Sequence, residues 1–179
     1  NQAEYGKVVY SESAPTILTY LITRVSGKST YEFALQELFE PLGIHIRYWI
    51  KNLEGVFTGG EGIYLTPRDM ARFGYLFLNH GNVDGKQLIS PEWITESTRS
   101  HGAVPVETHS CYNETGYGYL WWIGDNAGYD CYTARGYGGQ AIVVIPGMDL
   151  VMVFTHNWRG FRSEHETESI CRILMMMTE

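Results

Sequence analysis

Residues 132–156, with the sequence YTARGYGGQAIVVIPGMDLVMVFTH, decide the fold that we predict for this chain. They contain two apolar runs, 141–145 and 150–154, which are rich in valine and isoleucine. Neither run alternates polar with apolar residues, so both faces of each strand are expected to be covered, as in central strands. Pro146 and Gly147 stand between the runs. Because proline fixes the first central dihedral of a turn and glycine accepts a positive φ at the second, we predict a tight type II hairpin turn.

Glycines open the first of these two strands, in the segment Gly136-Tyr137-Gly138-Gly139-Gln140. Glycines in such a place indicate either that another group passes close to the backbone or that the strand begins with a bulge or tight bend. The sequence leaves both readings open.

Helix signals precede the hairpin, and further strand signals surround it. Helices are predicted to begin at Ser13 (ending at Gly27), at Ser29 (with a capping box to Glu32 and an end at Pro41), at Thr66 (ending at His80-Gly81) and at Ser90-Pro91 with Trp93 and Ile94 as apolar anchors. A polar surface loop is predicted over 100–116, strands over 117–123 and 129–135, and a terminal helix over 163–177. Helices and strands do not alternate, so we predict an α+β fold in which an antiparallel sheet is flanked by helices.

The composition is that of one globular domain over residues 1–179, with 44% hydrophobic residues. A net charge of −7 without a cluster of basic residues argues against nucleic acid and anionic membrane surfaces as partners. No apolar run approaches the roughly 20 residues that cross a bilayer, and the N-terminus does not read as a signal peptide. Asn1 cannot be an initiator methionine, so we expect a mature, cleaved or excised piece of something longer.

Cysteines and histidines do not form a recognisable metal site. Cys111, Cys131 and Cys171 lack CxxC spacing and read as buried or idle thiols, although a Cys111–Cys131 disulfide is an alternative in an exported protein. No two histidines stand at helical i, i+4 spacing, and the local pair of His109 with Cys111 is a weak zinc candidate. We therefore expect no metal and no cofactor, and the compartment stays undecided.

Familiar catalytic motifs are absent from the chain. It contains no GxSxG, no P-loop and no HExxH sequence. Two segments remain that could take part in catalysis: Tyr10-Ser11, directly before the first helix, and the glycine-rich segment 136–140. From the residues alone, Tyr10 reads as a packed aromatic side chain rather than as a catalytic phenol, because most tyrosines are packing residues.

Three separate segments, in order, resemble a known family. VVYSESAPTILTYLITRVSGKSTYEFALQELFEPLGI resembles the region around the tyrosine motif of the β-lactamase and penicillin-binding-protein family of serine hydrolases. GIYLTPRDMARFGYLFLNHG is similar to the next stretch of that family, and GYGYLWW with ARGYGGQAIVVIPGMDLVMVF is similar to its closing sheet. The resemblance is closest to the branch of esterases and amide hydrolases related to 6-aminohexanoate-dimer hydrolase and to class C enzymes.

The resemblance also exposes a gap. The family nucleophile lies in a Ser-x-x-Lys motif upstream of the tyrosine, and no Ser-x-x-Lys sequence occurs here. The chain therefore resembles the C-terminal half of a β-lactamase/transpeptidase-like domain that lacks its N-terminal portion. We expect it to be inactive alone and to pair with the missing N-terminal half, to form a homodimer or to be marginally stable.

The resemblance implies roles for several residues in the complete protein. Tyr10 would carry a proton between the upstream serine and the leaving group, and the backbone N–H of Tyr137 would donate to the oxyanion. Ala134-Arg135-Gly136 stands where the family has Lys-Thr-Gly or His-Thr-Gly, so Arg135 would contact an acidic substrate only if it points inward. The remaining residues expected to contact substrate are Glu12, which stands where many relatives carry asparagine, Gly136, Gly138, Gln140 and Trp122.

Two functions follow as hypotheses. The first is a serine hydrolase half that would cleave a small-molecule ester or amide through an acyl-serine intermediate. The second is a non-catalytic protein of the same fold that binds peptide or glycan in an aromatic-lined cleft. An upstream sequence without the serine or the lysine would favour the second.

Overall fold

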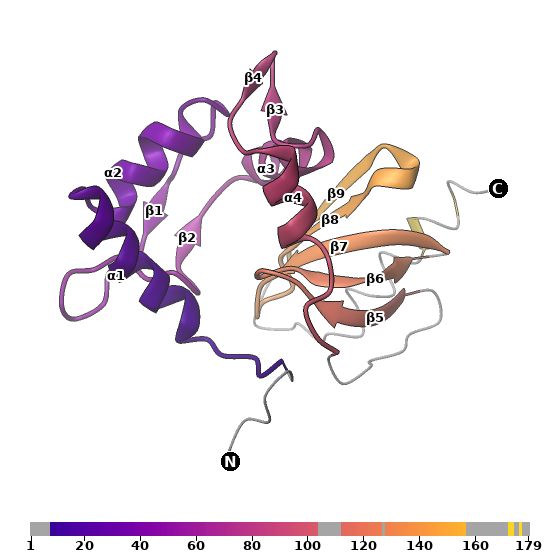
Figure 1. The fold of residues 1–179 in the computed structure, drawn as a ribbon, viewed down its shortest axis with the longest axis horizontal. Helices are drawn as coiled ribbons and strands as arrows, with labels where there is room; N and C mark the ends of the chain where they lie inside the picture. The colour runs from indigo at the N-terminus through magenta and orange to yellow at the C-terminus, as the bar shows by residue number, and fades with distance from the viewer. Residues whose placement is uncertain (1–7, 104–111, 127, 157–171, 174–175, 177–179) are drawn as a thin grey trace.

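The structure, a computed structural model, describes residues 8–103, 112–126, 128–156, 172, 173 and 176. Helices come first along the chain and a five-stranded antiparallel sheet follows (Figure 1). The helical elements are α1 (Ala14–Ser26), α2 (Thr30–Ala34), the π-helix η1 (Leu35–Phe39), α3 (Pro67–Leu78), α4 (Pro91–Ser97) and the 3-10 helix η2 (Pro146–Met148).

The sheet joins its strands in chain order, β5 to β9, as a simple meander. Its strands are β5 (Tyr112–Tyr117), β6 (Trp122–Asn126), β7 (Tyr129–Arg135), β8 (Ala141–Ile145) and β9 (Leu150–Phe154). Two short two-stranded sheets, β1 (Tyr48–Trp49) with β2 (Ile63–Tyr64) and β3 (Asn82–Val83) with β4 (Lys86–Gln87), lie outside it. The predicted α+β class with an antiparallel sheet is confirmed.

The predicted central hairpin is present as β8 and β9, which pair from Ala141 opposite Phe154 to Ile145 opposite Leu150. Every residue of β8 is buried, whereas β9 is buried only in part. The predicted type II turn is wrong. Residues 146–148 form a 3-10 turn, and the residue with positive φ is Asp149, at 51°, rather than Gly147. Asp149 adopts this left-handed conformation because a short polar side chain tolerates it better than most.

Helix α3 packs across β8 and β9, and a glycine sets how close it comes. A Cβ atom on Gly74 would lie 2.6 Å from Val151 Cγ1 and 2.8 Å from Ile142 Cγ2. The helix backbone therefore rests directly on the sheet, a separation that a larger side chain would increase. One buried cluster fills this face of the sheet: Phe77, Ile94, Trp121, Tyr132, Ile142 and Val144.

The opposite face of the sheet carries a second buried cluster: Cys131, Ala141, Val143, Ile145, Met152 and Phe154. Alternate residues of β8 thus enter different clusters, which explains why the run shows no alternation of polar and apolar residues. Of the three cysteines, Cys131 is buried in β7, while Cys111 and Cys171 lie outside the described residues. The disulfide alternative stays a prediction.

Helix α3 begins with a capping box. Asp69 accepts a hydrogen bond from the Thr66 backbone N–H, and the Thr66 hydroxyl accepts one from the Asp69 N–H. Arg72 Nη1 lies 3.0 Å from Asp69 Oδ1 and also donates to the Gly43 carbonyl oxygen. Burial raises the pKa of the Asp69 carboxyl, but hydrogen bonds from Thr66 and Arg72 outweigh it and lower that pKa below its usual value.

The N-terminal helices form a third buried cluster with the far side of α3: Phe39, Leu42, Ile44 and Leu76. The predicted capping box of Ser29 with Glu32 is present, and Gly27 ends α1 with a φ of 69°. Ser13 occupies the N-cap position of α1, but its side chain makes no capping hydrogen bond.

Several apolar side chains of α1 are exposed. Ile17, Leu21 and Val25 are 60%, 51% and 85% exposed, and Thr19 is the buried residue of the helix. The helical spacing of these residues correctly predicts the helix. It does not predict that their face points away from the rest of the described chain.

The aromatic segment is the clearest error of the strand prediction. Residues 117–123 are not one strand, because β5 ends at Tyr117 and β6 begins at Trp122, with a turn between them. Leu120 has a φ of 67° in this turn. The predicted surface loop over 100–116 is wrong for its last part, since residues 112–116 belong to β5.

Two other predictions concern the helices. Trp93 is not a buried anchor of α4, because its side chain is 52% exposed, whereas Ile94 is buried as predicted. The predicted terminal helix over 163–177 lies almost entirely outside the described residues. In the part of the chain that the structure describes, no helix has the length and apolar character needed to cross a membrane, and no three potential ligands gather as a metal site.

We expect Asp69→Asn to lower the free energy of unfolding at pH 7 by about 1–2 kcal/mol, because it removes the charge that Thr66 and Arg72 stabilise. The folded-state pKa of Asp69 is lowered, so this stabilisation is fully present above the unfolded-state pKa of about 3.9 and is lost as pH falls through the folded-state pKa. Urea unfolding at several pH values should show that the difference in the free energy of unfolding between Asp69→Asn and the unsubstituted protein becomes smaller in acid.

The matched control is Asp149→Asn, which replaces an exposed aspartate in a conformation that asparagine also adopts. It should leave the free energy of unfolding nearly unchanged. An Asp69→Asn gap that stayed constant from pH 7 into acid would contradict the assigned charge contribution.

Candidate active site

Tyr10 lies in the segment that leads into α1, and its ring packs against the sheet. It stacks on Trp122 with ring centroids 5.7 Å apart and planes 25° apart, and it meets Tyr117 edge-on at 6.2 Å. Tyr117 and Trp122 are themselves in edge-to-face contact at 5.0 Å. The three rings form one group, which we call the aromatic cluster, and the Tyr10 ring is still 57% exposed.

The two phenols of the aromatic cluster differ. Burial and the nearby Tyr10 raise the pKa of Tyr117 to about 12. Tyr117 is therefore neutral at any physiological pH. Tyr10, which is more exposed, is the phenol that a ligand can reach.

The β7–β8 turn is built on its own backbone and on Gln140. Gly136 N–H donates to the Gln140 carbonyl oxygen at 2.8 Å, Gly139 N–H to the Gly136 carbonyl oxygen at 3.1 Å, and Gly138 N–H to Gln140 Oε1 at 3.1 Å. A Cβ atom on Gly136 would lie 2.7 Å from that same Oε1 atom. The glycines thus make a tight bend, and the close approach is that of the Gln140 side chain.

Tyr137 stands at the tip of this turn. Its side chain is 97% exposed, and within the described residues nothing accepts a hydrogen bond from its backbone N–H. Such an N–H is open to an acceptor on a ligand.

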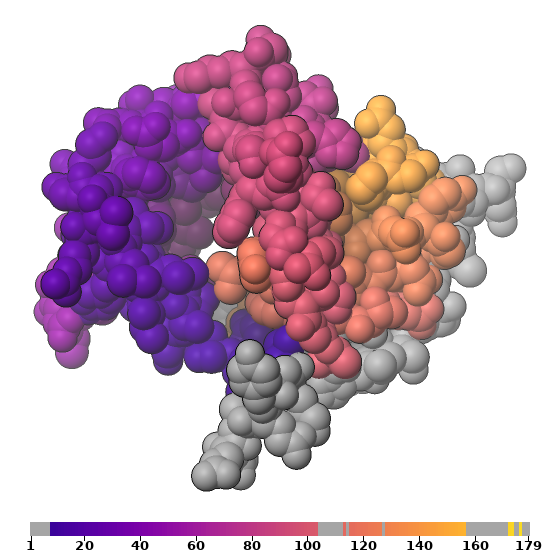
Figure 2. All heavy atoms as spheres, viewed as in Figure 1, coloured from indigo at the N-terminus to yellow at the C-terminus, as the bar shows by residue number. Residues whose placement is uncertain are grey.

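Strand register brings these two regions to one end of the sheet. Trp122 pairs with Thr133 on β7, and Arg135 at the end of β7 pairs with Ala141 on β8. The β5–β6 and β7–β8 turns therefore lie at the same end, which faces α1 (Figure 1). Figure 2 shows the molecule hollowed between the indigo N-terminal segment and the magenta segment, with orange atoms of the sheet inside.

The other predicted contact residues occupy varied positions. Glu12 is exposed two residues after Tyr10, and Arg135 is half-buried at the end of β7. Gly138 is buried within the turn, and the Gln140 side-chain oxygen is engaged by its N–H. Trp122 is half-buried in the aromatic cluster, whereas its neighbour Trp121 is a core residue. Tyr10 and Trp122 are in contact, and the catalytic or binding roles of all these residues remain predictions.

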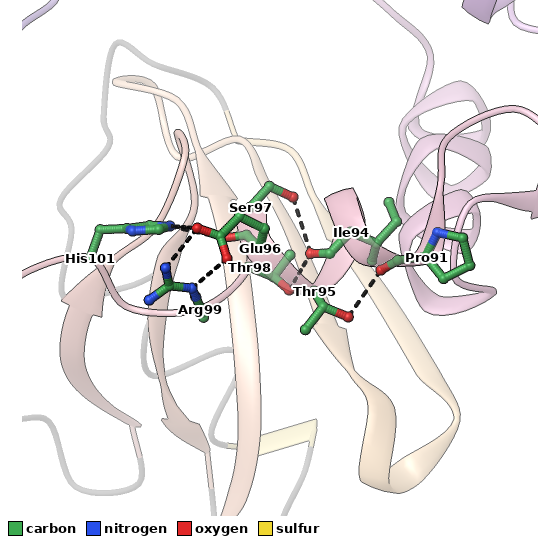
Figure 3. Close-up of polar contacts among 8 residues, drawn as sticks. All are labelled: Pro91, Ile94, Thr95, Glu96, Ser97, Thr98, Arg99 and His101. Atoms are coloured by element: carbon green, nitrogen blue, oxygen red, sulfur yellow. Dashed lines mark hydrogen bonds and ion pairs between the residues drawn. The ribbon is translucent and has the colours of Figure 1, made fainter.

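The β5–β6 turn is fastened to the end of α4. Tyr119 N–H donates to the Ser97 carbonyl oxygen at 2.8 Å, and the His101 ring stacks on Tyr119 with centroids 4.2 Å apart. Glu96 holds Arg99 through two contacts of 2.6 Å, and its backbone carbonyl oxygen lies 2.8 Å from His101 Nε2 (Figure 3). Hydrogen bonds from Arg99 lower the pKa of the Glu96 carboxyl. This arrangement holds the turn that precedes Trp122.

Sequence reasoning missed Tyr117 and this fastening of the turn. The aromatic run predicts a strand that begins at Tyr117, whereas Tyr117 is the last residue of β5, and no spacing in the sequence indicates that it contacts Tyr10. The run YGYLWW is aromatic enough to have suggested a ring cluster, but it does not say which rings face the segment before α1.

Two sequence comparisons relate the chain to known proteins. A family model described as Beta-lactamase matches residues 2–170. The chain is 26% identical over 170 residues to the 6-aminohexanoate-dimer hydrolase of Paenarthrobacter ureafaciens, a match that covers 89% of this chain and 42% of that protein.

Solved structures show the same fold. A putative 6-aminohexanoate-dimer hydrolase from Bacillus anthracis matches with a TM-score of 0.77 and 23% identity, over 96% of this chain and 44% of that one. An octameric penicillin-binding protein homologue from Pyrococcus abyssi matches with a TM-score of 0.77 and 20% identity, over 99% of this chain and 44% of that one.

The chain thus spans less than half the length of each of these relatives. The family model, by contrast, covers nearly all of the chain, and the predicted resemblance is confirmed. The chain belongs to the β-lactamase family.

Proposed function

We propose that this chain supplies the tyrosine and one oxyanion donor of a serine hydrolase that cleaves an ester or a small amide. Its partner in catalysis is a Ser-x-x-Lys segment encoded upstream, since the chain contains no such motif. One observation carries the proposal: Tyr10 stacks on Trp122 at the end of the sheet where, among the described residues, nothing accepts a hydrogen bond from the Tyr137 N–H.

The proposed reaction has two steps. The upstream serine Oγ bonds to the carbonyl carbon, the bond to the leaving alcohol or amine breaks, and the serine proton passes through Tyr10 to that leaving group. Water then attacks the acyl-serine ester and releases the acid and the free serine. In both steps the carbonyl oxygen becomes negative, and the Tyr137 N–H together with the N–H of the serine would stabilise it.

Tyr10 needs a nearby cation for this role. A free phenol has a pKa near 10, and an adjacent positive charge favours the phenolate. The ring neighbours of Tyr10, Tyr117 and Trp122, carry no charge. The lysine of the upstream motif would supply the cation, so the site is incomplete without that segment and the isolated chain is expected to be inactive.

The substrate class rests on the relatives. One relative is named 6-aminohexanoate-dimer hydrolase, which makes a small amide or ester the natural first substrate to try. Arg135 and Glu12 would face the two ends of such a substrate only if both point into the site, and each is a proposal in its own right.

The exposed face of α1 supports an upstream partner segment. Ile17, Leu21 and Val25 expose apolar surface on the helix that directly follows Tyr10, and contiguous apolar surface of this kind usually marks an interface. We propose that the upstream half of the same domain covers it. A homodimer is the alternative occupant, and the octameric relative shows that assembly occurs among similar folds.

A second function is favoured by the aromatic cluster itself. Three rings in contact, at the same end of the sheet as the exposed Tyr137, would suit stacking of peptide or sugar groups without any chemistry. An upstream sequence that lacks the serine or the lysine would decide for this binding function.

We expect Tyr10→Phe in the full-length protein to lower kcat for p-nitrophenyl acetate by about 10²- to 10⁴-fold, the range for loss of a general acid–base group. Phenylalanine keeps the ring on Trp122 and removes only the hydroxyl. The control Tyr75→Phe removes a phenol from the exposed face of α3 and should keep full activity. Unchanged turnover in Tyr10→Phe would remove Tyr10 from the mechanism.

We expect residues 1–179 alone to bind an apolar fluorescent dye through α1. Replacing Ile17, Leu21 and Val25 with glutamine keeps helix propensity and should abolish most of the dye fluorescence, as should adding the upstream half. The control is Leu53→Gln, which alters an exposed apolar residue outside α1. A compact monomer in static light scattering that binds no dye would contradict the proposed interface.

A further inference from the structure

Two glycines outside the proposed site touch the backbone that carries Tyr10. A Cβ atom on Gly60 would lie 2.7 Å from the Glu12 carbonyl oxygen, and one on Gly59 would overlap the Pro15 carbonyl oxygen. Neither glycine has a positive φ, so the reason for the missing side chain is space alone. The loop 51–62 therefore lies directly against residues 12–15.

That loop is itself firmly held. The carbonyl oxygen of buried Thr58 accepts a hydrogen bond from the Trp49 indole N–H at 2.7 Å, and the Thr58 hydroxyl donates to the Glu61 carbonyl oxygen at 2.7 Å. Trp49 packs edge-on against Phe39 of the N-terminal core cluster. A side chain added at Gly59 or Gly60 would therefore displace residues 12–15 more readily than the loop.

A second contact joins the loop to α1. The Tyr20 hydroxyl donates to the Glu54 carboxylate and accepts a hydrogen bond from the Asn52 side-chain amide at 2.8 Å. The loop thus contacts α1 at two places. Its glycine backbone lies against the first residues of the helix, and its side chains Asn52 and Glu54 bind Tyr20 in the middle of the helix.

Only Ser11 separates Glu12 from Tyr10 in the sequence, and the Tyr10 ring stacks on Trp122. We propose that Gly59 and Gly60 are positioning residues for Tyr10. Because neither has a side chain, the loop can lie close against residues 12–15, and this position of the backbone places the Tyr10 ring on Trp122. The kinetic part of this inference rests on the function proposed above for Tyr10, while its structural part does not.

The test uses Gly60→Ala and Gly59→Ala in the full-length protein labelled with 3-fluorotyrosine. The ¹⁹F resonance of Tyr10 is assigned by its absence in Tyr10→Phe, and stacking on Trp122 gives it a ring-current shift. We expect both glycine variants to move this resonance toward that of an exposed tyrosine. The control Gly147→Ala, where a Cβ atom would meet only a side chain at 3.3 Å, should leave it in place.

Kinetics supply the second readout. Gly60→Ala should lower kcat about 10- to 100-fold, as expected for a misplaced catalytic group, while KM changes by less than about threefold. In the Tyr10→Phe background the same substitution should cost nothing further, because a residue that acts through Tyr10 has no effect once the hydroxyl is gone.

An unmoved Tyr10 resonance in Gly60→Ala, or an equal kcat loss with and without the Tyr10 hydroxyl, would overturn the inference. Gly60→Ala has the milder contact, so it decides if Gly59→Ala does not fold. If Tyr10→Phe is as active as the unsubstituted protein, the proposed function fails, and the ¹⁹F resonance still decides whether the glycines position the ring.

Discussion

The contact of α3 with its two neighbours is the constraint on which the rest of the structure depends. One side of the helix lies on β8 and β9, where Gly74 lets the backbones approach and Phe77 enters the cluster over the sheet. Its other side carries Leu76 into the cluster of the N-terminal helices. A single helix thereby fixes how the helical part and the sheet face each other, and a capping box at Thr66 stabilises the start of this helix.

Tyr10 also connects the helical part to the sheet. The aromatic cluster joins the segment before α1 to β5 and β6, while α1 itself exposes apolar residues. Among the described residues, the sheet is buried on both faces while Ile17, Leu21 and Val25 of α1 stay exposed, as expected for a domain built together with another segment. The proposed chemistry needs such a segment too, because a tyrosine and an oxyanion donor cannot cleave a substrate without a nucleophile.

The sequence predicted those features that local chemistry dictates. The β8–β9 hairpin, the capping box of Ser29 and the start of α3 at Thr66 follow from residue patterns, whereas the family rested on the resemblance of three longer segments. The errors have local causes too: Leu120 takes a positive φ where no glycine or asparagine marks a turn, and Asp149 rather than Gly147 does so after Pro146. Contacts between distant segments, such as Tyr10 with Trp122 or Gly60 with Glu12, leave no local pattern and needed the structure.

The most direct test of the central claim is fluorophosphonate labelling of the two halves, made as separate polypeptides and then combined, with the labelled residue identified by peptide mass mapping. The account predicts that label appears on the serine of an upstream Ser-x-x-Lys motif, and only when residues 1–179 are present. Label on a residue within 1–179, or equal labelling of the upstream half alone, would contradict it.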